Sequence, residues 1–82
     1  MRAAPEMQVE WVEDEAVVLD PNSRQLHYLN SAAALVYALI QEFGFEEAMH
    51  QLEHRYEPDS ELREGLPQLL DDMAERGLLI DD

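Results

Sequence analysis

Apolar residues recur at two different spacings along the chain, and the spacing changes near residue 30. Alternating apolar and polar positions from Gln8 onward predict a short strand with Trp11 facing the core. The apolar, β-branched run at 16–19 predicts a second strand, and the aromatic and aliphatic residues at 24–29 predict a third. Residues 20–23, Asp-Pro-Asn-Ser, are typical of a β-turn with proline at its second position. Three short antiparallel strands are therefore expected.

Helical spacing follows residue 30. Residues 32–43 are good helix formers and are apolar nearly all round, so this helix is expected to be the buried one. Either Asn30 or Ser31 can cap its start, and Gly44 is placed to end it with a left-handed backbone. A second helix is expected over 45–56, where apolar residues form one stripe.

A third helix is expected over 59–76, because leucines recur there at steps of three and four residues. Gly77 is placed to end it. Pro67 lies inside this helix, where proline removes an N–H and clashes with the carbonyl of Arg63. A kink or a break into two half-helices is therefore expected. Residues 78–80 are apolar and are expected to pack back in extended form.

The succession of strands and then helices predicts an α+β fold in one domain. Residues 1–7 show no periodicity and are interpreted as a flexible arm, and residues 8–82 as the domain. With 82 residues, 46% of them apolar, the chain can bury a modest core but not also a deep catalytic cavity. An enzyme is therefore not expected.

The net charge of the chain reduces the classes of partner that are expected. The chain has 19 acidic residues against five arginines, no lysine, and a formal net charge of −14. Nucleic acids and anionic membranes are bound mainly through lysine and arginine, so neither is expected as a partner.

No cysteine is present. Because no N-terminal signal is recognisable and the longest apolar run, 32–40, is too short to cross a bilayer, a soluble cytoplasmic protein is expected.

Candidate reactive groups are few. His50 and His54 lie one helical turn apart, a spacing that lets two imidazoles share a metal. The metalloprotease pattern needs a glutamate directly after the first histidine, and Gln51 stands there. We therefore expect two exposed, unligated histidines, no metal and no cofactor. The serines are better explained as turn and cap residues than as nucleophiles, and the paired acids as solvated faces.

The strand at 24–29 has one charge, at its start, and little else that guards a sheet edge. An open edge is a template for an added strand, so a peptide ligand is one interpretation. The alternative is that the arm or the third helix covers this strand.

Several stretches together resemble the PqqD-like family, over about residues 11–80. They are Leu19-Asp20-Pro21, the run from Leu29-Asn30-Ser31 through Ala34-Leu35-Val36-Tyr37, Leu69-Leu70 with Met73, and Arg76-Gly77-Leu78-Leu79. The resemblance implies a winged helix-turn-helix-like fold: a three-stranded antiparallel sheet followed by three helices. It also implies a non-catalytic element that binds the leader of a ribosomally made precursor peptide. Such elements serve modifying enzymes such as a radical SAM protein, a cyclase or a leader peptidase.

In that family the peptide groove lies between the third strand and the third helix. The resemblance implies that the strand side of the groove consists of Gln25, Leu26, His27, Tyr28 and Leu29. The helix side would comprise Leu62, Arg63, Leu66 and Leu70, with Leu66 facing the groove. Gly65 and Pro67 depart from the family pattern at the groove floor, and the second helix lacks the usual serine or threonine cap.

Two other functions remain open at this point. A winged-helix regulator would read DNA with its third helix, but residues 59–76 carry six acids against two arginines. A protein–protein adaptor or dimerisation module would present the same apolar groove to a partner protein.

Overall fold

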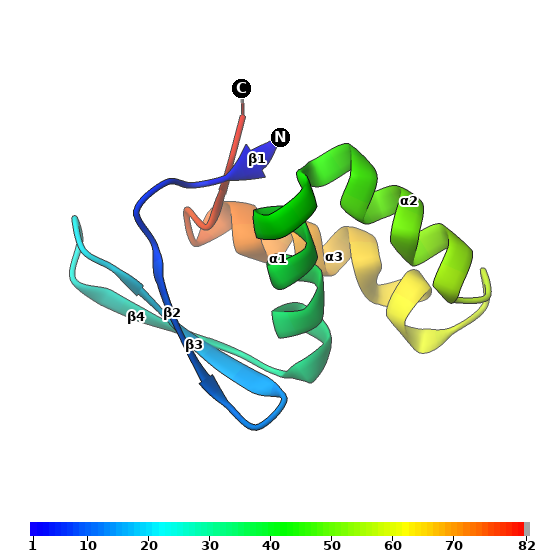
Figure 1. The fold of residues 1–82 in the computed structure, drawn as a ribbon, viewed down its shortest axis with the longest axis horizontal. Coiled ribbons are helices and arrows are strands. Elements are labelled where there is room, and N and C mark those ends of the chain that lie inside the picture. Colours follow the sequence, from blue (N-terminus) through cyan, green and yellow to red (C-terminus); the bar gives the residue numbers. More distant parts are fainter. Residues whose placement is uncertain (82) are drawn as a thin grey trace.

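The computed structural model describes residues 1–81; Asp82, the last residue of the expected domain, lies outside them. Strands come first and helices follow, with a short strand at each end of the chain (Figure 1). In chain order the elements are β1 (Arg2–Ala3), β2 (Gln8–Val12), β3 (Glu15–Asp20), β4 (Gln25–Leu29), α1 (Ser31–Phe43), α2 (Phe45–Arg55), α3 (Glu61–Glu75) and β5 (Leu79–Ile80). The expected α+β fold, with a three-stranded sheet followed by three helices, is confirmed.

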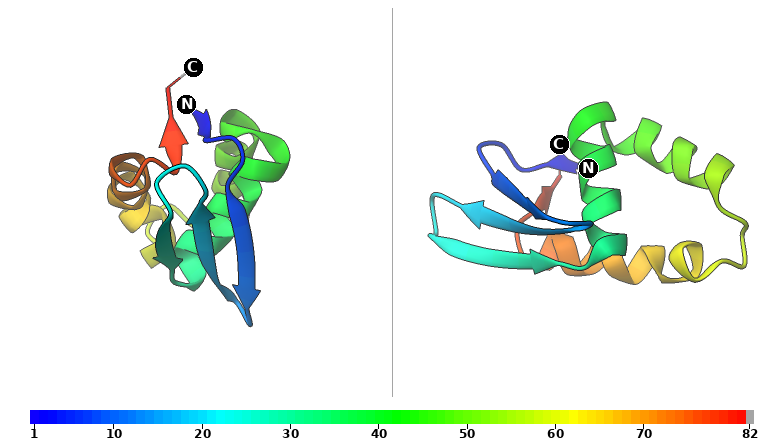
Figure 2. Two further views of the ribbon diagram at one scale, coloured as in Figure 1. Left: turned by 90° about the vertical axis from the view of Figure 1, so that its left-hand side faces the viewer. Right: turned by 60° about the horizontal axis from the view of Figure 1, so that its bottom comes forward.

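The main sheet has the strand order β2-β3-β4, and both pairs of strands are antiparallel. Trp11 pairs with Ala16 and Ala16 with Leu29, so these three side chains share one face of the sheet. Ala16 and Leu29 are buried, which makes this the inner face. No helix of residues 1–81 lies over the outer face in the three views of the ribbon (Figures 1 and 2). As predicted, β4 is an edge strand.

The turn between β3 and β4 is slightly longer than expected. The N–H of Arg24 donates to the carbonyl of Asp20, four residues back, over 2.7 Å. The Asp20 carboxylate accepts from the N–H groups of Asn22 and Ser23, and these bonds, the one from Asn22 first, lower the pKa of Asp20. Arg24 has a φ of 61° and belongs to this turn, so β4 begins one residue later than predicted.

The chain ends pair with each other. β1 and β5 form a two-stranded antiparallel sheet in which Ala3 lies opposite Leu79. Ala4 is buried, and its N–H donates to the carbonyl of Leu78 over 2.9 Å. Within residues 1–7, which the sequence analysis interprets as a flexible arm, β1 is the part that pairs with β5. The extended, inward-packed segment at residues 78–80 agrees with the prediction.

The core is built around α1, as expected. Val36, Tyr37 and Ile40 of this helix are buried against residues of the sheet, of α2 and of α3, among them Val18, Leu52 and Met73. Asn30 caps the helix by accepting from the N–H of Ala33 at 2.9 Å, which decides between the two predicted caps. Gly44, with a φ of 88°, ends it.

Two packing predictions need correction. α3 is one continuous helix that contains Pro67, so the break into half-helices is wrong. Leucines on both sides of the proline pack against the same core and hold the two halves together. Trp11 lies on the inner face as predicted but is 50% exposed, because it contributes to the lining of an open cavity beside α1 and is not covered by that helix.

Candidate functional site

The free edge of β4 faces α3, and a cavity separates the two elements. Figure 2 shows β4 as the strand of the main sheet that lies on the side of α3. The cavity has a volume of about 390 Å³. Tyr28, Asn30 and Ala33 line it from the strand end and the start of α1. The lining from α3 and its cap is Gly65, Gln68, Leu69, Asp72 and Arg76.

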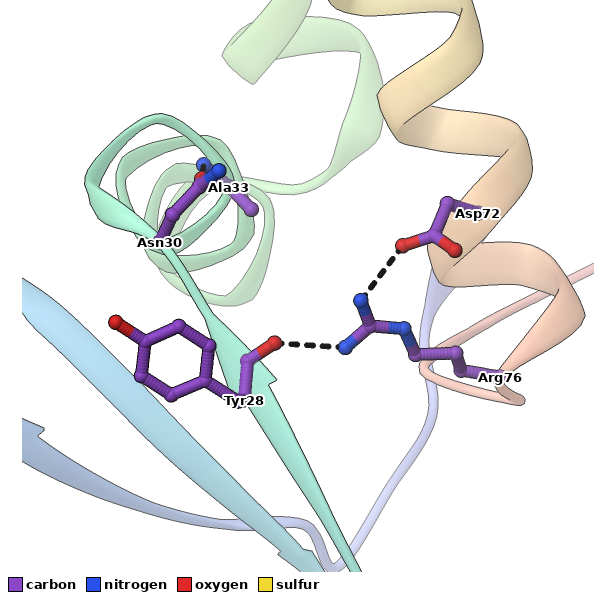
Figure 3. Close-up of polar contacts among 5 residues, drawn as sticks. All are labelled: Tyr28, Asn30, Ala33, Asp72 and Arg76. Carbon is purple, nitrogen blue, oxygen red and sulfur yellow. Dashed lines mark hydrogen bonds and ion pairs between the residues drawn. The ribbon is translucent and has the colours of Figure 1, made fainter.

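The backbone of β4 has hydrogen-bonding groups that β3 leaves unpaired. The carbonyl of Tyr28 accepts from Nη1 of Arg76 at 2.8 Å, so it points away from β3 (Figure 3). In an antiparallel pair, residues alternate between those that bond to the partner strand and those whose N–H and C=O point outward. Leu26 stands two residues from Tyr28 and has the same orientation. The N–H and C=O groups of Leu26 and Tyr28 are therefore the outward-facing groups of this edge.

Side chains of β4 divide between the two faces of the sheet. Leu26 and Tyr28 lie on the outer face and are 69% and 56% exposed. A hydrogen bond to the Glu15 carboxylate raises the pKa of the Tyr28 phenol. His27 and Leu29 lie on the inner face. Leu29 is buried, whereas His27 is half-buried, with an Nε2 atom that is shielded from solvent and has no hydrogen-bond partner among residues 1–81.

The residues predicted for the helix side of the groove all lie on α3, where three of them pack against the core. Leu62, Leu66 and Leu70 pack against the core, and Leu62 also lines the cavity beside α1 that contains Trp11. Arg63 donates from Nη1 to the carbonyl of Tyr56 at 3.3 Å. The four predicted residues are not among those that line the cavity beside β4.

Sequence reasoning missed the residues of α3 that do line this cavity: Gln68, Leu69, Asp72 and Arg76. Together with Gly65 they recur at steps of three and four residues and so share one helix face. The leucine spacing identifies the stripe of α3 that packs against the core. Successive residues of a helix point about 100° apart, so Gln68, Asp72 and Arg76 lie on a neighbouring face, whereas Leu69 both packs against the core and lines the cavity. The available signal was Gly65, a helix-interior glycine that departs from the family pattern.

The end of α3 places Arg76 at the cavity. Arg76 is the C-cap, and Gly77 follows it with a φ of 79°. The N–H of Gly77 donates to the carbonyl of Ala74, and the N–H of Leu78 donates to that of Met73. These two bonds with a left-handed glycine form a Schellman motif. Leu78 and Met73 are both fully buried, so the helix end and the position of Arg76 are fixed.

Arg76 is held on two sides. Its Nη2 lies 2.8 Å from Oδ2 of Asp72, one turn back on α3, while Nη1 donates to Tyr28 (Figure 3). An arginine has five N–H donors, so these two contacts do not use all of them. Arg76 thus joins the end of α3 to the edge of the sheet.

Other candidate chemistry is sparse. The Nε2 atoms of His50 and His54 are 3.1 Å apart and exposed on α2. Within residues 1–81 no group of three or more histidine, cysteine, aspartate or glutamate side chains is arranged to hold a metal ion. None of the helices in that same range has the length and apolar content needed to cross a bilayer.

Comparison with known proteins identifies the family of this chain. No curated protein sequence matches the chain. Among solved structures, "TbiB1 in Complex with the TbiA(beta) Leader Peptide" is similar in fold, with 20% identity, a TM-score of 0.74 and full coverage of both chains. The family model of coenzyme PQQ synthesis protein D, PqqD, matches residues 15–79. That match spans most of the chain, from β3 to β5, and the protein therefore belongs to the PqqD family.

Proposed function

We propose that this protein captures the leader segment of a ribosomally synthesised precursor peptide by adding it as a strand to β4, and presents it to a modifying enzyme. The observation that carries the proposal is the edge of β4 at Leu26 and Tyr28, which no other strand of residues 1–81 pairs with and which lies beside a cavity between β4 and α3. Membership of the PqqD family and the leader-peptide complex of TbiB1 support the same function. The protein binds and presents its ligand and performs no chemistry itself.

Strand addition at this edge supplies two kinds of contact. The backbone of the peptide bonds to the outward groups of β4, and each such bond contributes about 0.5–1.5 kcal/mol after the loss of water. Side chains of the added strand alternate between the two faces. Residues directly opposite Leu26 and Tyr28 share the exposed outer face with them, and their neighbours point towards the cavity and α3.

The cavity accepts an apolar anchor. Ala33, Gly65 and Leu69 give it an apolar part, and neither Ala33 nor Gly65 has a side chain larger than a methyl group. Burying one large aliphatic or aromatic side chain contributes about 1.5–3 kcal/mol. One anchor residue therefore contributes more than any single backbone bond. The affinity for the peptide depends chiefly on the anchor, whereas the backbone bonds align the peptide along β4.

The proposed site keeps the whole predicted strand side, Gln25–Leu29. On the helix side the contact residues are Gly65, Gln68 and Leu69. Of the residues that the resemblance implies there, Leu62, Leu66 and Leu70 act by packing α3 against the core, and Arg63 by joining α3 to the end of α2. A radical SAM protein, a cyclase or a leader peptidase remains the proposed class of partner enzyme.

A peptide selection tests this function. The protein serves as bait for a library of random peptides displayed on ribosomes, and short precursors encoded beside its gene are tested in parallel. Amide chemical shifts are then followed during titration with the peptide that binds best, here named the selected peptide. We expect shifts concentrated in Gln25–Leu29 and in the part of α3 around Leu69. Enrichment no better than with an unrelated bait, or shifts confined to α2, would contradict the proposal.

A further inference from the structure

Arg76 occupies a hydrogen-bond acceptor that an added strand needs. A strand paired along the whole edge of β4 would donate an N–H to the carbonyl of Tyr28. Nη1 of Arg76 already donates to that oxygen at 2.8 Å. A guanidinium donor gives a charge-assisted bond, which is stronger than the neutral bond that a peptide N–H could offer.

The position of Arg76 is held independently of any ligand. The Schellman motif at Gly77 fixes its backbone, and Asp72 pairs with its second nitrogen at 2.8 Å. The side chain of Arg76 is about one-third exposed, so it is partly enclosed between β4 and α3. Displacing it from the edge of β4 would break its bond to Tyr28 and disturb its pairing with Asp72.

The guanidinium and a peptide backbone exclude each other at this point. Neighbouring strands lie about 4.8 Å apart, so an added strand at Tyr28 would run through the space beside the carbonyl that Nη1 of Arg76 now fills. Either Arg76 moves away, or the added strand stops at Tyr28.

We propose that Arg76 sets the register of the bound peptide by ending the added strand at Tyr28, an inference that rests on the proposed function. The peptide pairs with the N–H and C=O of Leu26 and with the N–H of Tyr28, whereas Arg76 remains the donor to the Tyr28 carbonyl. Beyond this point the peptide leaves the edge. The peptide residue that reaches the Tyr28 carbonyl therefore needs no N–H of its own, and Arg76 determines specificity by fixing which residue that is.

Backbone N-methylation of the selected peptide, one residue at a time, tests the register. Each methyl group removes one N–H donor, and a lost bond weakens binding by about 2- to 12-fold. With the wild-type protein, we expect methylation to weaken binding at one edge-paired position, the peptide residue whose N–H donates to the Leu26 carbonyl. In Arg76→Gln the Tyr28 carbonyl is freed, and we expect a second sensitive position to emerge two residues from the first. Arg55→Gln, an equal change of charge on α2, is the matched control and should retain the wild-type pattern.

A second measurement does not depend on the variant. The ¹³C shift of the Tyr28 carbonyl should stay nearly constant when the selected peptide binds, while that of the Leu26 carbonyl changes.

A further variant, Asp72→Asn, should weaken the pairing that keeps Arg76 in place. Its methylation pattern should lie between those of wild type and Arg76→Gln. The same sensitive positions in wild type and Arg76→Gln, or a Tyr28 carbonyl shift as large as that of Leu26, would overturn the register role. If the amides of Leu26 and Tyr28 do not respond to any selected peptide, the proposed function itself fails.

Discussion

Gly65 in the second turn of α3 and Ala33 in the first turn of α1 line the same cavity, and neither has a side chain larger than a methyl group. Apart from its chain neighbours and the adjoining backbone of its own helix, a Cβ atom placed on Gly65 would meet no atom within 4 Å. Glycine inside a helix is less stable than alanine by about 0.5–1 kcal/mol. Gly65 therefore lowers the stability of α3, and it leaves space next to β4.

Substitutions of Gly65 should affect the stability of the protein and its affinity for the peptide in different ways. We expect Gly65→Ala to raise the free energy of unfolding by about 0.5–1 kcal/mol, as measured by urea denaturation. Gly65→Phe should fold as well but fill the cavity and weaken binding of the selected peptide on the order of tenfold, equivalent to about 1.4 kcal/mol. Unchanged affinity in a folded Gly65→Phe variant would show that the cavity does not receive an anchor.

Proline substitutions should distinguish the two edges of β4. Leu26→Pro removes an N–H that points outward, so it should weaken peptide binding severalfold, by the roughly 0.5–1.5 kcal/mol of one bond. His27→Pro removes an N–H from the ladder with β3 and should destabilise the fold more than Leu26→Pro does. Thermal unfolding of both variants by circular dichroism provides the comparison. Equal destabilisation would mean that the outward assignment of Leu26 is incorrect.

Much of the fold follows from sequence because its local signals agree with the packing. The strand alternation, the Asn30 cap and the terminal glycines all lead to the elements that the structure contains. The pairing of β1 with β5 has no local signal, since two-residue strands are specified only by the partner that they meet. The continuity of α3 through Pro67 lacks a local signal for a related reason: the core contacts of the leucines around it outweigh the local loss of one helical bond.

The candidate site was only partly predictable. The edge position of β4 follows from strand order, but the helix side depends on the rotation of α3 about its own axis. A leucine stripe defines the face towards the core, and it cannot show which neighbouring face meets a free edge. The contact of Arg76 with Tyr28 joins residues 48 positions apart, so no local pattern carries it.

Gly77 should be required for the end of α3. Its φ of 79° is a conformation that residues with a Cβ rarely adopt. We expect Gly77→Ala to lower the free energy of unfolding by about 1–2 kcal/mol and to loosen the Arg76 contact. Gly65→Ala is a matched control, because it makes the same change where the backbone imposes no such demand. An equally stable Gly77→Ala protein would contradict the structural role of the Schellman motif.

Alkaline pH should destabilise the protein through Tyr37. Burial raises the pKa of this phenol above 10.0, despite the bond that its oxygen accepts from Gln41. Because the folded pKa exceeds the unfolded one, the contribution is fully present below pH 10.0 and is lost as pH rises through the folded pKa. The chain contains no lysine to titrate in this range.

Urea denaturation of wild type and Tyr37→Phe at a series of pH values checks this expectation. The stability difference between the two proteins should shift in favour of Tyr37→Phe as pH rises above 10.0. Tyr28→Phe should be examined in parallel, since the pKa of Tyr28 is also raised, by its bond to Glu15. A pH-independent difference between wild type and Tyr37→Phe would contradict the assignment to Tyr37.

Hydrogen exchange at two amides tests strand addition most directly. In the free protein the N–H groups of Leu26 and Tyr28 face away from β3 and should exchange rapidly, whereas that of His27, bonded to β3, should be protected. If the selected peptide binds as an added strand, both outward amides should become protected on the order of tenfold or more, with little change at the amides of β2. Saturating peptide that leaves Leu26 and Tyr28 exchanging at their free rates would contradict the account.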